Sequence, residues 1–153
     1  MPKNLMFTLT AKNIVARARL LEDKAPHTCR ILWAHLPYRG TCFHAIYSGT
    51  IAAILIDPTI VIPTENATVQ IQTGDLMFTH YDAGVRHGHP DALSEIYWAY
   101  DRYCQPTAPG QMIPVYPNVF GQMLPGSEAF FEASRRMQME GAAPIEITGE
   151  VVD

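Results

Sequence analysis

The spacing of hydrophobic and polar residues divides the chain into short elements. Hydrophobic residues alternate with polar ones over 5–9 and again over 14–20, on either side of a turn at 11–13, which predicts a β-hairpin. An amphipathic helix is predicted from Pro26 to Leu36, because apolar residues recur there every three or four positions and Pro37 stops the pattern.

The remaining apolar runs predict further strands and a second helix. The strands are expected over 41–47, 51–56, 68–72, 76–81, 93–100 and 145–152. Ser127 is typical of a helix N-cap and Gly141 of a C-terminal end, so the second helix is expected between them. Many short strands favour a barrel or a sandwich. The Pro- and Gly-rich stretch 105–126 is expected to be a functional loop or an ordered surface crossover.

Composition and charge narrow the class of protein. With 153 residues, 48% of them hydrophobic, the chain is expected to form one domain over 1–153. Because the net charge is −4 and no basic aromatic stripe is present, nucleic acid and membranes are not expected as partners. The N-terminus resembles no secretory signal, and the three cysteines follow no zinc or disulfide spacing, so a cytoplasmic location with free thiols is expected.

Two motifs lie between Asp23 and Gly49. Residues 23–28 read D-K-A-P-H-T, and residues 38–46 read Y-R-G-T-C-F-H-A-I. Both resemble motifs of the cyclophilin family, in which the first one introduces the first helix. The resemblance implies a mainly β fold, a cyclophilin-like closed antiparallel β-barrel of eight strands with two short α-helices, one at each end.

The departures from the family pattern concern its catalytic residues. The resemblance places the isomerase arginine at Ala45, and the substrate-contacting phenylalanine and glutamine at Thr50 and Ala53. A methyl group cannot donate the hydrogen bonds that stabilise a twisted amide, so conventional prolyl isomerisation is not expected. The whole chain is similar to a branch of small bacterial cyclophilin-like proteins, through His-Ala-x-x-Ser-Gly at 44–49 and Gly-Asp-Leu at 74–76. Related modules occur in hydrolases of ureides and cyclic amides.

A strand over 41–48 would place Cys42, His44 and Ser48 on one face, and Ala45 on the other. His44 is then a candidate general base, and Ser48 a candidate nucleophile or hydrogen-bond donor. Alternate residues on a strand lie about 6.5–7 Å apart, too far for a direct nucleophile–base pair, so a partner from another strand is required. A structural histidine and a buried, inert Cys42 are the alternatives. We expect the site on the His44 face.

Glu95 and Tyr97 alternate with Ile96 and Trp98. If the latter pair faces the core, Glu95 and Tyr97 face either a cleft or solvent. In a cleft, the carboxylate could act as general base and the phenol as hydrogen-bond donor. An exposed strand glutamate is the alternative.

Residues that could contact a polar organic ligand occur in two further segments. Tyr116, Asn118 and Phe120 in the long loop are candidate substrate contacts. Arg86 is the nearby cation for an anionic group. His80, His87 and His89 could bind a metal, but their spacing does not fit a cupin-type site, and neither a metal nor a cofactor is predicted.

These observations favour a small-molecule pocket with amide chemistry, such as hydrolysis or ring opening of a small cyclic amide or ureide. A non-catalytic module that binds a metabolite or a protein on a degenerate isomerase barrel is the alternative. A metal-dependent enzyme using the three histidines and residual prolyl isomerisation are further alternatives. A homo-oligomer is compatible with a small barrel.

Overall fold

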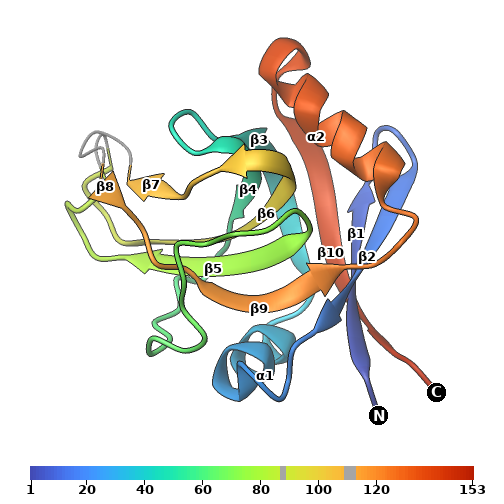
Figure 1. The fold of residues 1–153 in the computed structure, drawn as a ribbon, viewed down its shortest axis with the longest axis horizontal. Coiled ribbons are helices and arrows are strands. Elements are labelled where there is room, and N and C mark those ends of the chain that lie inside the picture. Colours follow the sequence, from blue (N-terminus) through green and yellow to red (C-terminus); the bar gives the residue numbers. More distant parts are fainter. Residues whose placement is uncertain (87–88, 109–112) are drawn as a thin grey trace.

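Eight antiparallel strands close into a barrel in this computed structural model, which describes residues 1–86, 89–108 and 113–153 (Figure 1). The predicted cyclophilin-like architecture, a mainly β barrel with two helices, is confirmed. The strands of the described residues are β1 (Lys3–Leu9), β2 (Ile14–Leu20), β3 (Tyr38–His44), β4 (Gly49–Leu55), β5 (Asp75–Tyr81), β6 (Leu93–Cys104), β7 (Thr107–Ala108), β8 (Ile113–Pro114), β9 (Asn118–Met123) and β10 (Ala143–Val151). The helices are α1 (Pro26–Ala34) and α2 (Glu128–Glu140).

The order of strands around the barrel is β1, β10, β3, β4, β6, β5, β9 and β2. The predicted hairpin is confirmed, with Leu9 opposite Ile14 and Phe7 opposite Ala16. The first and last strands, β1 and β10, also pair, so the two ends of the chain lie close together (Figure 1). Strands β3, β4, β6 and β5 are consecutive neighbours, and this part of the barrel positions the candidate site.

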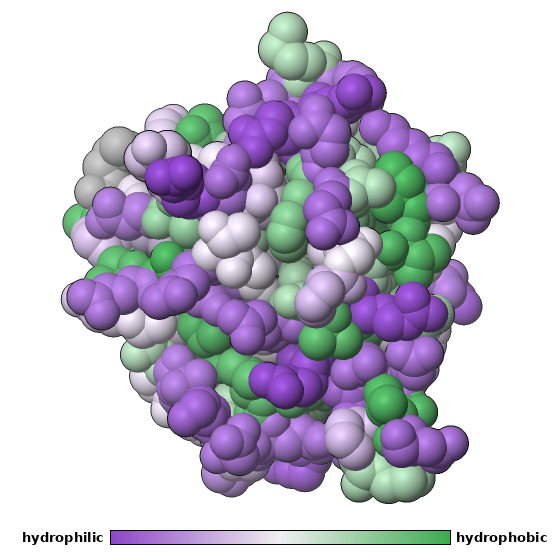
Figure 2. Space-filling view, turned by 45° about the vertical axis from the view of Figure 1, so that its right-hand side comes forward, coloured by the Kyte–Doolittle hydropathy of each residue, from purple (hydrophilic) through white to green (hydrophobic). Residues whose placement is uncertain are grey.

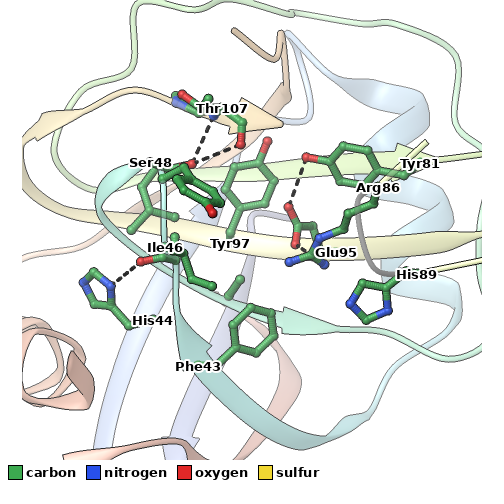
Figure 3. A pocket seen from close by; sticks show the side chains of 15 residues that line it. Phe43, His44, Ile46, Ser48, Tyr81, Arg86, His89, Glu95, Tyr97 and Thr107 are labelled. Carbon is green, nitrogen blue, oxygen red and sulfur yellow. Dashed lines mark hydrogen bonds and ion pairs between the residues drawn. The ribbon is translucent and has the colours of Figure 1, made fainter. Parts of the chain in front are cut away.

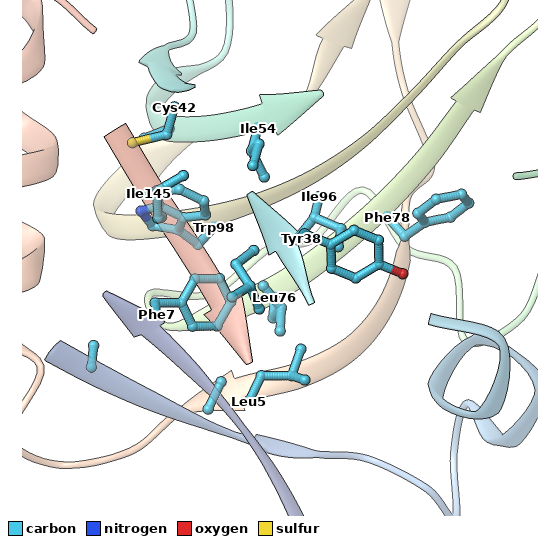
Figure 4. Packing of buried hydrophobic residues seen from close by; sticks show 14 of the residues in the cluster. Leu5, Phe7, Tyr38, Cys42, Ile54, Leu76, Phe78, Ile96, Trp98 and Ile145 are labelled. Carbon is cyan, nitrogen blue, oxygen red and sulfur yellow. The ribbon is translucent and has the colours of Figure 1, made fainter. Parts of the chain in front are cut away.

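Inward-facing side chains form the main core (Figure 4). Where α2 packs on the barrel, the fully buried rings of Phe7, Trp98 and Phe130 lie with centroids 5.2–5.8 Å apart. Burying each such side chain stabilises the fold by roughly 1.5–3 kcal/mol. The indole N–H of Trp98 donates to the hydroxyl of Ser134 over 2.9 Å, which fastens α2 to the barrel. The buried polar atom of the indole is thereby satisfied.

A glutamate from a distant segment caps the N-terminus of α1. Glu65 accepts hydrogen bonds from the backbone N–H and ring of His27 at 3.2 and 3.0 Å. It also accepts from the backbone N–H and hydroxyl of Thr28 at 2.9 and 2.8 Å. Burial opposes ionisation of this carboxyl, but the four hydrogen bonds outweigh it and lower the pKa of Glu65 to about 2. The cap ties the segment before β5 to α1. It takes the place of an N-cap side chain, because Ala25 before the helix provides none.

A second apolar cluster lies on the outer face of β4, β5, β6 and β9. Its buried members are Ile51, Ala53, Met77, Tyr97, Ala99 and Val119, and Phe43 and Ala45 pack against them. These residues alternate with inward-facing ones, as Ala53 and Tyr97 do with Ile54 and Trp98. Where neighbouring segments cover this apolar outer face, a small molecule can be enclosed.

Two strand predictions and one loop prediction were wrong, in part or entirely. Strand β3 ends at His44, so residues 45–48 form a loop in which strand alternation does not apply. Residues 68–72 form no strand, and an isolated bridge from Ala67 to Asn118 lies beside them. The stretch 105–126 contains β9, a barrel strand that we expected to be loop. Its prolines and Gly121 obscure the strand pattern, and a Cβ at 121 would lie 2.9 Å from the side chain of Leu76, so close packing requires glycine there.

Neither helix of the described residues is long and apolar enough to cross a membrane. On the face shown in Figure 2, hydrophilic side chains predominate and hydrophobic ones gather in small patches. The enclosed outer-face cluster therefore offers a more specific candidate for binding than this surface does.

Candidate functional site

A cavity of about 160 Å³ lies on the outer face of β4 and β6 (Figure 3). Ile51, Ala53 and Tyr97 contribute from the strands, and the loop after β3 and the segment before β7 cover them. The other lining residues are Phe43, His44, Ala45, Ile46, Tyr47, Ser48, Tyr81, Arg86, His89, Glu95, Pro106 and Thr107. Pockets for drug-sized ligands measure roughly 300–1,000 Å³, so this cavity suits a smaller molecule.

Glu95 contributes a buried carboxyl group to the cavity. It lies opposite Thr79 of β5 and Leu55 of β4, and only 8% of its surface is exposed. Its one side-chain hydrogen bond to the described residues is accepted from the Tyr81 hydroxyl over 3.5 Å. Burial raises the pKa of Glu95, and Arg86 and Tyr81 offset part of that increase. The structure thus agrees with the cleft alternative for Glu95, and the expectation of an exposed strand glutamate was wrong.

Arg86 places a buried cation beside this carboxyl group. Its Nη1 lies 3.5 Å from Oε2 of Glu95, and its side chain is 14% exposed. The guanidinium carbon lies 5.9 Å from the ring centroid of Phe43 and 6.0 Å from that of Tyr81. The two rings hold the guanidinium in place through cation–π attraction. Figure 3 shows it between Glu95 and Phe43.

The hydrogen-bonding capacity of Arg86 is unused among the described residues. Its Nη1 is fully buried and has no hydrogen-bond partner among the described residues, because the 3.5 Å contact with Glu95 is close enough for an ion pair but long for a hydrogen bond. A guanidinium has five N–H donors, and buried polar atoms are nearly always paired. Nη1 therefore has hydrogen-bonding capacity that no described group of the protein satisfies, in a side chain that lines the cavity.

Tyr97 forms part of the cavity wall. Only 3% of its surface is exposed, and its hydroxyl lies 2.6 Å from that of Thr79. Burial, and then the nearby Glu95 and Tyr81, raise the pKa of Tyr97 well above its usual value, so the phenol stays protonated. The neutral hydroxyl group remains a hydrogen-bond donor, as the predicted role requires.

His44 borders the cavity, but its ring nitrogens are bonded elsewhere. Nδ1 lies 2.7 Å from the carbonyl oxygen of Ala45, so it carries the proton. Nε2 lies 2.6 Å from the hydroxyl of Tyr100 and 3.0 Å from the amide nitrogen of Gln138 on α2. The geometry agrees with the structural alternative for His44. The cavity lies mainly on the outer face, where Phe43 packs, and His44 also borders a second hollow beside Gln138. A site on the His44 face therefore stays a prediction.

Ser48 fastens the loop that covers the cavity. Its hydroxyl accepts a hydrogen bond from the backbone N–H of Thr107 at 3.0 Å and donates to the carbonyl of Thr107 at 3.5 Å. The backbone N–H of Gln105 donates to the carbonyl of Ser48. No imidazole or carboxylate of the described residues hydrogen-bonds this hydroxyl. The structure therefore does not pair Ser48 with a base, which a serine nucleophile needs.

The three candidate contacts from the long loop do not line this cavity, and their role as substrate contacts stays a prediction. Phe120 is fully buried in the main core, because β9 turns it inward. The side-chain amide of Asn118 donates to the hydroxyl of Thr28 and the carbonyl of Pro63, which makes it part of the α1 attachment. Tyr116 is 65% exposed and borders a separate hollow.

His80 and Asp82 lie beside that separate hollow with Ser94 close by. His80 Nδ1 lies 2.8 Å from Ser94 Oγ, and Nε2 lies 3.3 Å from Asp82 Oδ1. This serine is fully buried, and its hydroxyl already bonds both the N–H and the carbonyl of Ile60. The group therefore fastens the segment after β4 and lacks an accessible nucleophile.

The histidines considered as metal ligands do not gather in the part of the chain that is described. His80 borders the separate hollow and His89 the cavity, whereas His87 lies outside the described residues. Among the described residues, no three His, Cys, Asp or Glu side chains are placed to hold a metal ion. The hypothesis of a metal-dependent enzyme that uses the three histidines stays a prediction.

Sequence reasoning missed the aromatic side chains beside Arg86. Phe43 alternates with His44 and was assigned to the face thought inactive, and Tyr81 was the last residue of a predicted strand. Thr107, which holds Ser48, lies in the long loop without any pattern that marks it. Extending the strand alternation from Thr79 to Tyr81 would have placed Tyr81 on the outer face with Glu95.

The comparison with protein families gives one match. The model of the family described as "Protein of unknown function (DUF3830)" matches residues 7–149. The chain belongs to this family. No curated protein matches this member of the family.

Solved structures of the same fold share little sequence with this family member. McbB, solved in complex with tryptophan, has a TM-score of 0.69 at 18% identity. The alignment covers 97% of this chain and 46% of McbB, so the chain spans about half of that protein. A hypothetical protein from Archaeoglobus fulgidus has a TM-score of 0.59 at 16% identity, with 96% and 94% of the two chains covered. The Mimivirus cyclophilin has a TM-score of 0.55 at 12% identity, with 99% and 90% covered. These likenesses establish the cyclophilin-like fold.

Proposed function

We propose that the cavity beside Arg86 and Glu95 binds a small polar organic molecule and that the protein acts on an amide bond in it. The observation that supports this proposal is the buried Arg86–Glu95 pair, whose side chains make almost no hydrogen bonds to the described residues. A few unsatisfied polar groups in an otherwise apolar cavity are typical of a small-molecule site. Neither Ser48 nor His44 is assigned the role of nucleophile or base.

The proposed reaction is addition of water across the C–N bond of the amide. Arg86 stabilises the negative charge that develops on the carbonyl oxygen. Glu95 takes a proton from the attacking water while the new C–O bond forms, and then gives that proton to the nitrogen as the C–N bond breaks. Tyr97 donates a hydrogen bond to a polar group of the substrate. The products together contain one water molecule more than the substrate, and no redox step is needed.

A neighbour of the same fold supports the binding part of the proposal. McbB was solved in complex with tryptophan, so a cyclophilin-like structure can accommodate a small organic molecule in that protein. The shared fold assigns neither tryptophan nor any reaction to this chain. The chemical argument for an amide rests on Arg86 and Glu95 alone.

Incubation of the purified protein with cyclic imides, hydantoins and ureides tests the proposal, with products measured by mass spectrometry. We expect one class to be hydrolysed, and the Glu95→Gln variant to be at least about 100-fold slower, as is usual when a general base is lost. Glu132→Gln is the matched control, because Glu132 lies on the exposed side of α2 and pairs only with arginines there. Absence of hydrolysis across the whole panel would contradict the amide chemistry.

A second candidate function is binding without catalysis. It is favoured by the same cavity and by the fastened hydroxyl of Ser48, since no described nucleophile is activated. A thermal shift by a panel compound that is recovered unchanged after long incubation would support binding alone. Elemental analysis of untagged protein tests the metal-dependent alternative, which predicts a stoichiometric metal.

A further inference from the structure

The geometry of Arg86 and Glu95 points to a specific recognition element: we propose that the ligand presents the edge of a ring amide, with its carbonyl toward Arg86 and its N–H toward Glu95. This inference rests on the proposed function and specifies the substrate class. The molecules meant are cyclic imides, lactams and ureides that have an unsubstituted N–H next to a carbonyl.

Donors and acceptors lie side by side in the cavity. Arg86 and Glu95 both line the cavity. Nη1 of Arg86 is enclosed and has no hydrogen-bond partner among the described residues, and 3.5 Å away Oε2 of Glu95 accepts no hydrogen bond from them. A ligand that matches both needs an acceptor and a donor on one edge, at a similar spacing. The carbonyl and N–H of a cis amide have this arrangement, whereas those of a trans amide point in opposite directions.

A ring supplies the cis amide without a conformational penalty. In an open chain, the cis form of a secondary amide costs about 2.5–4 kcal/mol, so a linear amide would bind poorly to the same pair of groups. The ring constraint of a small imide or lactam removes this cost. The cavity volume of about 160 Å³ and the rings of Phe43 and Tyr97 suit a flat, small ring.

The charges of the pair favour a neutral ligand over an anion. Arg86 already faces the carboxyl group of Glu95, and a ligand carboxylate would bring a like charge close to Glu95. Other polar groups near Glu95 include the hydroxyls of Tyr81, Tyr97 and Thr79, and His89 also borders the cavity. The described lining includes no lysine and no second arginine for an additional anion.

Four small probes test this recognition by the wild-type protein. Succinimide has the free N–H, N-methylsuccinimide lacks it, N-methylacetamide has a trans amide, and benzoate is an anion. We expect an NMR titration to give a dissociation constant for succinimide at least about tenfold lower than for either analogue, because a donor is lost or misplaced. The Arg86→Lys variant, which keeps the charge but loses the planar fork, should bind succinimide several-fold more weakly.

The outcomes separate this inference from the proposed function. Equal binding of succinimide and N-methylsuccinimide would overturn edge recognition, while hydrolysis of any cyclic amide would still support the proposed function. Tighter binding of benzoate than of succinimide would also overturn it, because the ligand would then be an anion. Glu132→Gln, which leaves the cavity intact, should bind all probes like wild type, and its failure to do so would show that the titration does not report on this cavity.

Discussion

Arg86 and Glu95 form a buried ion pair of 3.5 Å in which neither side chain is well hydrogen-bonded by the part of the chain that the structure describes. Residue 86 belongs to the connection after β5, and residue 95 to β6, so the chain folds back to bring them together. Removing two charges from water costs free energy that imperfect hydrogen bonds do not recover. A pair of this kind adds little to stability, which makes a role in ligand recognition the better explanation for it.

Loss of one member of this pair should destabilise the protein more than loss of both. Arg86→Met and Glu95→Leu should each lower the free energy of unfolding by about 2–3 kcal/mol, because one buried charge remains without a partner. The double variant should be less destabilised than either single variant, so its loss should fall short of the sum of the two single losses by about 2 kcal/mol or more. Urea denaturation of the wild type, the two single variants and the double variant measures these free energies of unfolding. Strict additivity would show that the two side chains do not interact.

The pH dependence of catalysis should report on Glu95. Burial raises the pKa of this carboxyl above its ordinary value of 4.5, and the base must be ionised. We therefore expect kcat/KM to fall as the pH drops, with a midpoint above 4.5. Arg86 lowers the pKa of Glu95, so the Arg86→Gln variant should have its midpoint at a higher pH than wild type. A midpoint that does not move would exclude Glu95 as the titrating group.

The cap on α1 should make stability depend on acid pH. Despite the opposing effect of burial, hydrogen bonds from Thr28 and His27 lower the pKa of Glu65 from 4.5 to about 2. Since the folded pKa is the lower one, the stabilisation is fully present above pH 4.5 and disappears as the pH falls towards 2. Glu65→Gln should lose on the order of 2–3 kcal/mol at neutral pH and show a weaker dependence between these pH values. A Glu132→Gln control should retain the wild-type dependence.

Ser48 should contribute to the loop and not to the chemical step. Its hydroxyl bonds only the backbone of Thr107 among the described residues. Ser48→Ala should therefore raise KM a few-fold through a less ordered cover and change kcat by less than about tenfold, whereas loss of a nucleophile costs several powers of ten. Steady-state kinetics on a substrate from the panel separates a role of Ser48 in the loop from a role as nucleophile. A kcat reduced a thousandfold would assign the serine a covalent role.

The local periodicity of the sequence was sufficient for much of the barrel. The hairpin of β1 and β2, the start of α1 at Pro26 and the end of α2 before Gly141 follow from alternation and from helix-terminal residues. Strand β9 could not be found in the same way, because its pairing with β5 and β2 is a long-range property and its own stretch resembles a loop. Propensity yields to tertiary context in such segments.

The candidate site was predictable only in part. The alternation around Trp98 correctly placed Glu95 and Tyr97 on the outer face. The contact between Arg86 and Glu95 depends on how the connection between β5 and β6 folds back, and no spacing in the sequence shows this. The alternation assumed for residues 41–48 was wrong beyond His44, where β3 ends, so the positions of residues 45–48 could not be predicted from it.

A crystal structure of the protein with succinimide tests the central claim most directly. We predict that the imide lies in the cavity, with its carbonyl oxygen within about 3.2 Å of an Arg86 nitrogen and its N–H within the same distance of a Glu95 oxygen. An imide bound elsewhere, for example in the hollow beside His80 and Tyr116, or an Arg86–Glu95 pair that makes no contact with it, would contradict the account.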